Sequence, residues 1–318
     1  MAYHESPDFA SNRHFYDSYD SEAQIFLEDS SDRGELTSTL DAYLKSERES
    51  ILSQADSMAY IDAEQPRKFV QAFGLPLAPV EAIATIPKNQ YRETGNTLAY
   101  YDRSTDTLKL GPKAADRDDV VVHEYAHGTG IRVYTVKVIG AAVCDITSVR
   151  SGFTQGNHSF LEEGFSDLMR GMYSTVTDRE AESGVDQLPA RYIRTVDGEQ
   201  RFGHWAYAGV TLELLAEKNP EILDTLIQAR LSIAGLRTFA QQVNHLSPGL
   251  YKDLRDAPFG TFDAVLDTTA ERLFGKKADS VIQGIQQSSN ATRYAEDTLK
   301  QAGVELGKRP AALRVANK

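Results

Sequence analysis

Two histidines and a glutamate stand in the pattern H-E-x-x-H at residues 123–127. Residues 118–122, Asp-Asp-Val-Val-Val, predict the start of a buried helix that continues through this pattern. Because positions i and i+4 share one face of a helix, His123 and His127 can direct two imidazoles at one Zn²⁺. Glu124 lies beside them, where it can act on a metal-bound water as a general base. Two protein ligands leave a zinc site incomplete, so the pattern predicts a third ligand elsewhere in the chain.

A second predicted helix, over residues 160–172, supplies the missing carboxylate. Its apolar spacing is typical of a packed helix: Phe160, Leu161, Phe165, Leu168, Met169 and Met172. Glu163 and Asp167 are four residues apart and therefore share a face. Glu163 would complete a His₂Glu site with an open fourth position, and we expect one Zn²⁺ per chain. Asp167 would accept the N–H of a ligating imidazole and fix its tautomer. His158 is an alternative ligand, although a loop histidine is the commoner state.

Together the two segments resemble the gluzincin metallopeptidases, which include the thermolysin-like proteases and the zinc aminopeptidases. The similarity is carried by HEYAH and by the downstream stretch Leu-Glu-Glu-Gly-Phe-Ser-Asp at residues 161–167. Thermolysin-like members have N-E-x-x-S-D in the second helix and aminopeptidases have L-x-E-G-F-A, and both alignments place the ligand on Glu163 rather than Glu162. The resemblance covers roughly residues 95–215. One departure is the gap between His127 and Glu163, which is longer than in those patterns.

The resemblance implies an α+β, zincin-like fold: a small mixed sheet with an edge strand in the N-terminal lobe, an active-site helix, and a predominantly helical C-terminal lobe. It implies zinc-dependent hydrolysis of peptide bonds with Glu124 as general base. An endopeptidase is favoured because the G-x-M-E-N motif of the aminopeptidases is absent. The family supplies an oxyanion donor from beyond the ligand helix, and Tyr207 and His204 are the candidates here. The alternatives are that His204 caps a helix and that Tyr207 is a core residue, and Tyr134, Arg150 and Tyr173 stay open as donors.

Other interpretations of the two segments compete with this one. The first is an ordinary buried helix with two satisfied histidines, followed by a surface helix with an acidic stripe. The second is a metzincin, but Val133 stands where that pattern needs a third histidine. Gly128 and Gly130 are therefore interpreted as the end of the helix, where glycine adopts left-handed angles. The third is a non-catalytic zinc-binding or regulatory module that keeps a gluzincin fold, a role in which Glu124 would not be needed.

Composition limits the partners and the compartment. The 318 residues are 41% hydrophobic and 25% charged, with a formal net charge of −12, which argues against a nucleic-acid partner. No apolar run approaches the ~18 residues that span a bilayer, and the first residues lack the pattern of a signal peptide. The single cysteine, Cys144, fits a reducing compartment, and it also fits a secreted bacterial enzyme. We therefore expect a cytoplasmic enzyme with a peptide or protein substrate, and neither a membrane span nor a nucleic-acid partner.

The chain divides into three parts by composition and periodicity. Residues 1–35 are expected to be a flexible N-terminal segment, residues 36–175 to hold helices, a sheet and the zinc-binding region, and residues 176–318 to form a helical C-terminal lobe. Strands are expected at 80–86, 97–101, 107–110, 131–138 and 143–149; 97–101 and 107–110 are expected to pair as a hairpin, and the segment from 131 to 149 to form a second one. The resemblance implies that 107–110 is an edge strand that pairs with substrate, and the alternative is a plain structural strand. Further helices are expected at 36–58, 65–73, 206–216, 220–234, 262–274, 278–285 and 292–302.

Overall fold

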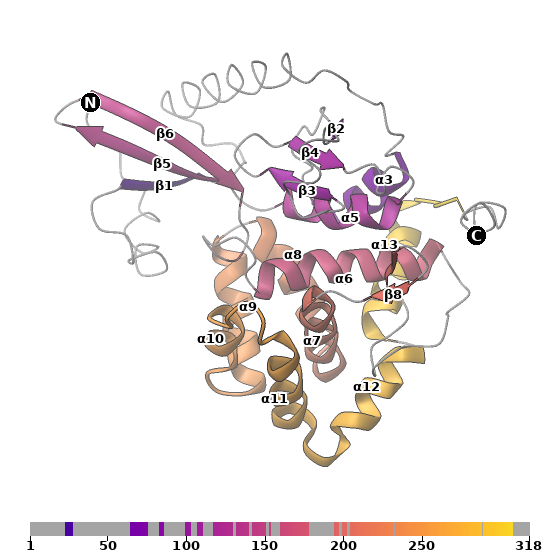
Figure 1. The fold of residues 1–318 in the computed structure, drawn as a ribbon. Helices are drawn as coiled ribbons and strands as arrows, with labels where there is room; N and C mark the ends of the chain where they lie inside the picture. The colour runs from indigo at the N-terminus through magenta and orange to yellow at the C-terminus, as the bar shows by residue number, and fades with distance from the viewer. Residues whose placement is uncertain are drawn as a thin grey trace.

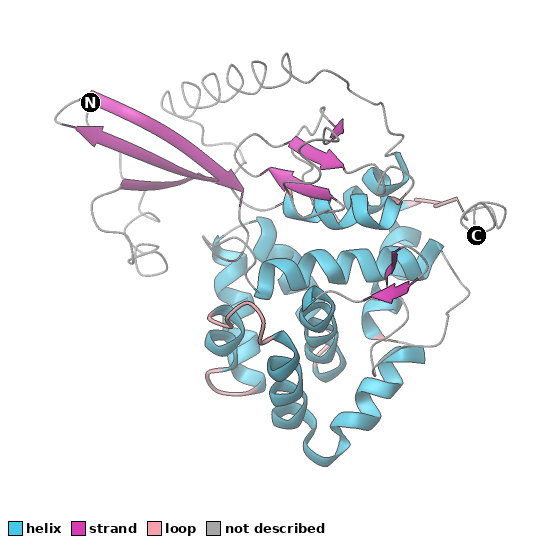
Figure 2. Ribbon diagram, viewed as in Figure 1, coloured by secondary structure: helices cyan, strands magenta, loops and turns pink. Residues whose placement is uncertain are grey.

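The computed structural model describes residues 23–27, 64–75, 83–85, 99–102, 107–110, 117–129, 132–139, 142–150, 153, 160–177, 194–196, 199–201, 204–231, 233–287 and 289–307. In this part of the chain, helices form the larger share of the structure (Figures 1 and 2). The helix expected at residues 36–58 lies outside the described residues.

Three short strands form a mixed sheet next to α5 (Asp118–His127). The central strand is β4 (Thr107–Leu110), which pairs parallel with β2 (Ile83–Thr85) and antiparallel with β3 (Ala99–Asp102). The antiparallel pairing of 97–101 with 107–110 is therefore confirmed. The expectation that 107–110 is the edge strand is wrong, because β2 occupies the side of β4 that β3 leaves open. Among the described strands, β2 and β3 form the edges of this sheet.

A second sheet is built around the segment between the two predicted metal-binding helices. Strands β5 (Arg132–Ile139) and β6 (Ala142–Arg150) form the expected hairpin, which extends away from the helices in Figure 1. Strand β1 (Ala23–Leu27) pairs antiparallel with β5. These five residues belong to the N-terminal segment that was expected to be flexible, and the rest of that segment lies outside the described residues.

The C-terminal part of the described chain is helical apart from a short hairpin of β7 (Arg194–Val196) and β8 (Glu199–Arg201). Its α-helices are α7 (His204–Lys218), α8 (Ile222–Leu231), α9 (Ile233–Leu246), α10 (Leu250–Arg255), α11 (Phe262–Phe274), α12 (Ala278–Gln287) and α13 (Asn290–Ala302), with a 3₁₀ turn at Gly275–Lys277. The helix predicted at 65–73 is α3 (Glu64–Ala72).

One helix predicted in this region is two. Residues 220–234 were expected to be continuous, but α8 ends at Leu231 and α9 begins at Ile233, and the two helices then pack against each other. Their approach is close, since a Cβ at Gly235 would lie 2.1 Å from the carbonyl oxygen of Gln228. Apolar residues continue through the break, so periodicity alone did not reveal it.

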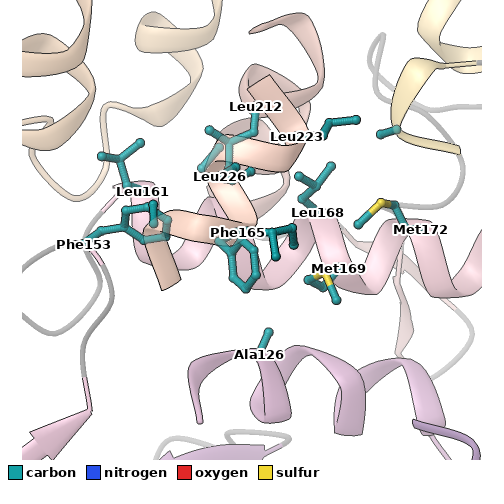
Figure 3. Close-up of a cluster of buried hydrophobic side chains, with 14 of the residues drawn as sticks. Ala126, Phe153, Leu161, Phe165, Leu168, Met169, Met172, Leu212, Leu223 and Leu226 are labelled. Carbon is teal, nitrogen blue, oxygen red and sulfur yellow. The ribbon is translucent and has the colours of Figure 1, made fainter. Parts of the chain in front are cut away.

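Helix α6 (Phe160–Thr177) lies between α5 on one side and the C-terminal helices on the other (Figure 1). Residues 160–173 are all buried. Figure 3 shows Phe165 and Met169 on the side of α6 that faces Ala126 of α5, and Leu212 and Leu226 on the other side. A single cluster of buried side chains runs from α3 and α5 through α6 to α13. The alternative of a surface helix with a solvated acidic stripe therefore does not describe α6.

The end of α5 also differs from the expectation. The helix ends at His127, but Gly128 has φ −71° and ψ −9°, in the right-handed region. Space at this position is tight, because a Cβ at Gly128 would lie 3.1 Å from the ring of Tyr101 on β3, which would have to shift. The prediction of a left-handed Gly128 is thus wrong, and Gly130 lies outside the described residues.

Candidate metal centre

Helix α5 presents both histidines of the H-E-x-x-H pattern on one face. Its first turn carries Asp118 and Asp119, whose charges complement the positive end of the helix dipole. His123 and His127 are each only 5% exposed, and their ring centroids are 5.0 Å apart. The spacing of four residues therefore places two buried imidazoles beside each other, as the sequence predicted.

Helix α6 brings a carboxylate to both imidazoles. Glu163 Oε2 lies 3.4 Å from His123 Nε2 and 3.5 Å from His127 Nε2. One ligand atom from each of the three side chains lies within 4.8 Å of the other two. In a tetrahedral site with metal–ligand bonds of about 2.0–2.1 Å, neighbouring ligand atoms are roughly 3.3–3.4 Å apart. The two distances from Glu163 are close to that spacing, so the donor set fits a small divalent metal.

The other ring nitrogen of His123 is held by Asp167. His123 Nδ1 lies 2.9 Å from Asp167 Oδ1, and because a carboxylate only accepts, the Nδ1–H donates. Arg170 donates to the same carboxylate through Nε at 2.9 Å and through Nη2 at 3.3 Å. Arg170 Nη1 also lies 3.7 Å from Asp119 Oδ2 on α5. His123 is therefore backed by a chain of alternating charges that joins the two helices, buried at Asp167 and Arg170 and partly exposed at Asp119.

The other ring nitrogen of His127 is held in the same way by Glu162. Glu162 Oε1 lies 3.0 Å from His127 Nδ1, and Ser166 Oγ lies 3.1 Å from the same nitrogen. Glu162 also forms a buried ion pair with Arg230 of α8. With both Nδ1 atoms bound to carboxylates, the Nε2 atoms are the ones that face Glu163, which is the tautomer a metal at this point requires.

The carboxylates around His123 change its affinity for protons. Burial lowers the pKa of His123, but hydrogen bonds to Asp167 and Glu163 and the charges of Asp167 and Glu124 outweigh it, so the pKa is raised above 6.5. The metal-free chain therefore holds the proton of His123 more tightly than an ordinary histidine does. A metal ion that bound this imidazole would have to compete with that proton.

The structure describes the side chains of only some of the other residues predicted for the site. Glu124 follows His123 on α5, is 7% exposed and adds its charge to the group. Tyr207 is half-buried on α7 and packs against both hydrophobic clusters of the described residues, as the core interpretation expected. Its role as oxyanion donor stays a prediction. His204 is the first residue of α7, and its side chain lies outside the described residues, as does His158.

Three charged residues of this cluster were not identified from the sequence: Glu162, Arg170 and Arg230. Arg170 had a local signal, because it stands three residues after Asp167 on the same helix. Glu162 was considered only as a rival ligand, and its partner on α5 lies 35 residues away. Arg230 lies 68 residues from Glu162 and carries no motif. Contacts at such separations follow from packing and have no pattern in the sequence.

No known family model, curated protein or solved structure significantly matches this chain. None of the helices among the described residues is long and apolar enough to cross a bilayer.

Proposed function

We propose that this protein is a zinc-dependent metallopeptidase, with an endopeptidase favoured over an aminopeptidase. One Zn²⁺ would be held by His123, His127 and Glu163, and Glu124 would act as general base. The observation that carries the proposal is the position of the Glu163 carboxylate, 3.4 and 3.5 Å from the two Nε2 atoms, while both Nδ1 atoms are bound to other carboxylates.

The donor set supports zinc over the hard cations. Two imidazole nitrogens and one carboxylate are ligands that Zn²⁺ prefers in catalytic sites, where a fourth position stays open. Ca²⁺ and Mg²⁺ prefer oxygen ligands, and this group offers a single carboxylate with two nitrogens. Fe²⁺ also binds sets of two histidines and a carboxylate, so the identity of the metal is part of the test.

The side chains around the proposed site have distinct roles in hydrolysis. A Zn²⁺ held by His123, His127 and Glu163 would polarise a carbonyl oxygen and would lower the pKa of a bound water to about 7. Glu124 is next to His123 in a largely buried position, where it can take a proton and deliver it to the leaving amine. Asp167 and Glu162 hold the two imidazoles in one orientation. Tyr207, or His204 as the alternative, is proposed to donate to the oxyanion.

The proposed substrate is a peptide or protein, because the chemistry of a zinc-bound water and a carboxylate base suits amide hydrolysis. The net charge of −12 argues against a nucleic-acid substrate. The cytoplasm is proposed as the compartment, on the single cysteine of the chain.

Metal analysis and peptide cleavage together test this proposal. The purified chain should carry about one Zn²⁺, and Glu163→Ala should lose most of it, because one of three protein ligands is gone. Glu124→Gln should keep its zinc while cleavage of a generic peptide mixture falls by at least ~10²-fold. Glu271→Gln and Glu271→Ala, at an exposed position of α11, are the matched controls and should change neither property.

Three results would count against the proposal. Full zinc occupancy in Glu163→Ala would remove Glu163 from the ligand set. Iron in place of zinc would overturn the proposed metal. Zinc in the wild type without any peptide cleavage would favour the alternative, a non-catalytic zinc-binding or regulatory module in which Glu124 has no catalytic role.

A further inference from the structure

Arg230 is a fully buried arginine that reaches the candidate metal centre from the C-terminal helices. It lies on α8 and forms an ion pair with Glu162, and both side chains are 0% exposed. Its guanidinium lies over the rings of Phe165 and Phe153, with the Cζ atom 4.8 and 5.3 Å from their centroids. Burying a charge in such surroundings is costly unless its donors are bound, so the partners of Arg230 determine its role.

Those partners belong to two different helices. Nη1 pairs with Glu162 of α6, whereas Nη2 donates to the carbonyl oxygens of Ala126 at 2.7 Å and His127 at 3.3 Å, at the C-terminal end of α5. Nε donates to Thr129 Oγ1 at 3.3 Å. The last carbonyls of a helix lack partners within it and carry partial negative charge. The planar guanidinium group of an arginine, with its several N–H donors, can bind these carbonyl oxygens and a carboxylate at the same time.

Arg230 contacts His127 in two ways, directly at its backbone and indirectly, through Glu162, at its imidazole ring. The backbone carbonyl of His127 accepts from Arg230, and the Nδ1 of its ring is bound to Glu162, which Arg230 holds from the other side. We propose that Arg230 is a positioning residue for His127: it fixes the orientation of the imidazole through Glu162 and the position of the backbone through the end of α5. This inference rests on the proposed metal site.

The two histidines then differ in where their support comes from. His123 is held through Asp167 and Arg170, which stand three residues apart on α6. His127 is held through Glu162 by an arginine on α8, from the part of the chain that follows the metal-binding segments. Perturbing Arg230 should therefore affect His127 and leave His123 largely unchanged.

Zinc affinity and the imidazole resonances test this role. Zn²⁺ affinity is measured by chelator competition at about pH 8 for the wild type, Arg230→Lys, Arg230→Met, Glu162→Gln and the double variant. We expect Arg230→Lys and Arg230→Met to bind Zn²⁺ about 10–100-fold more weakly, the range typical for partners of metal ligands. Lysine should not replace Arg230, because one ammonium group cannot reproduce the planar arrangement of N–H donors in the guanidinium. Arg272→Met, which breaks a partly exposed ion pair with Asp253, is the control and should bind like the wild type.

The double variant separates positioning from folding. Arg230→Met alone leaves Glu162 as a buried charge without its cation and can fail to fold. Glu162→Gln with Arg230→Met replaces the ion pair by neutral groups, while the amide oxygen of Gln still accepts from His127. If Arg230 acts in part through Glu162, the double variant should lose less Zn²⁺ affinity than the product of the two single losses, because coupled effects are not additive. Its remaining loss relative to Glu162→Gln reports the contacts of Arg230 with the end of α5. If the losses of Zn²⁺ affinity in the two single variants simply multiply in the double variant, Arg230 does not act through Glu162.

The nitrogen-attached proton of each imidazole gives the decisive readout. In ¹H–¹⁵N spectra of the metal-free chain, Arg230→Lys should shift the Nδ1–H resonance of His127 and leave that of His123 in place. Equal shifts of both, or unchanged Zn²⁺ affinity in Arg230→Lys, would overturn the positioning role while the proposed metal site stands. A wild type that takes up no Zn²⁺ would overturn the proposed function itself, and this inference with it.

Discussion

Asp167→Asn is the sharpest perturbation of the group around His123, because it changes one atom and one charge. Asp167 Oδ1 accepts from His123 Nδ1 and from Arg170 Nε, both at 2.9 Å, and Oδ2 accepts from Arg170 Nη2 at 3.3 Å. Asparagine can keep both bonds at the Oδ1 position. Its amide group then faces a guanidinium that can only donate, so one bond and the buried counter-charge are lost.

The expected loss of stability in Asp167→Asn follows from the burial of Asp167 and its partner Arg170. Asp167 and Arg170 are each 1% exposed, and removing one partner of a buried pair costs about 3–5 kcal/mol. Asparagine retains two bonds and Asp119 lies 3.7 Å from Arg170, so we expect the unfolding free energy of the metal-free chain to fall by about 3 kcal/mol. Zinc affinity should fall by ~10–100-fold because His123 loses a charged acceptor.

Asp253→Asn is the matched control, since it makes the same change in an exposed pair. Asp253 Oδ2 lies 2.6 Å from Arg272 Nη1, with side chains 60% and 28% exposed, so the cost should be at most about 1 kcal/mol. Urea unfolding in chelator gives the stability, and competition at about pH 8, where protons compete little, gives the zinc affinity. If the two variants bind zinc equally, Asp167 does not support His123 at a metal site.

Three further predictions concern the surrounding structure. Gly164→Ala should lower the unfolding free energy by about 1–2 kcal/mol, because the new Cβ would lie 3.0 Å from the backbone oxygen of Ala208 and α7 must move; a stabilised variant in urea would contradict this close approach. Burial and the hydrogen bond to Asp224 raise the pKa of Tyr294 above 10. The folded chain therefore holds that proton more tightly, and the stability it contributes should be full below about pH 10 and fall as the pH rises further; Tyr294→Phe should lack this contribution, and parallel pH curves of the two chains would refute it. Removing Zn²⁺ from a solution that holds it at ~100 times its Kd should lower the unfolding free energy by about 2.7 kcal/mol, and Glu163→Ala should show little of this change.

Much of the secondary structure follows from periodicity and local chemistry. The helix at Phe262–Phe274 and the strand at Thr107–Leu110 have the bounds that their apolar spacing predicted. The prediction of one continuous helix over 220–234 is wrong, because the end of α8 at Leu231 and the start of α9 at Ile233 accompany the packing of these two helices against each other. The central position of β4 could not be predicted for a similar reason, since it depends on a partner strand more than twenty residues earlier in the chain.

The sequence by itself determined which side chains share a helix face. His123 with His127, and Glu163 with Asp167, are four residues apart, and 3.6 residues per turn places each pair together wherever the helix lies. That relation is a property of the backbone and needs no tertiary structure. It was enough to predict a set of candidate metal ligands and a carboxylate partner, Asp167, for one of the two imidazoles.

Only the tertiary structure decided how the two faces meet and what lies behind them. The packing of α6 on α5 places Glu163 between the two Nε2 atoms, and it pairs His127 with Glu162, which no spacing had indicated. Arg230 enters from α8, and its donors reach the buried carboxylate of Glu162 and the last carbonyls of α5 where water is excluded. These contacts arise only once the helices are packed, since each of these groups can be solvated by water in the unfolded chain.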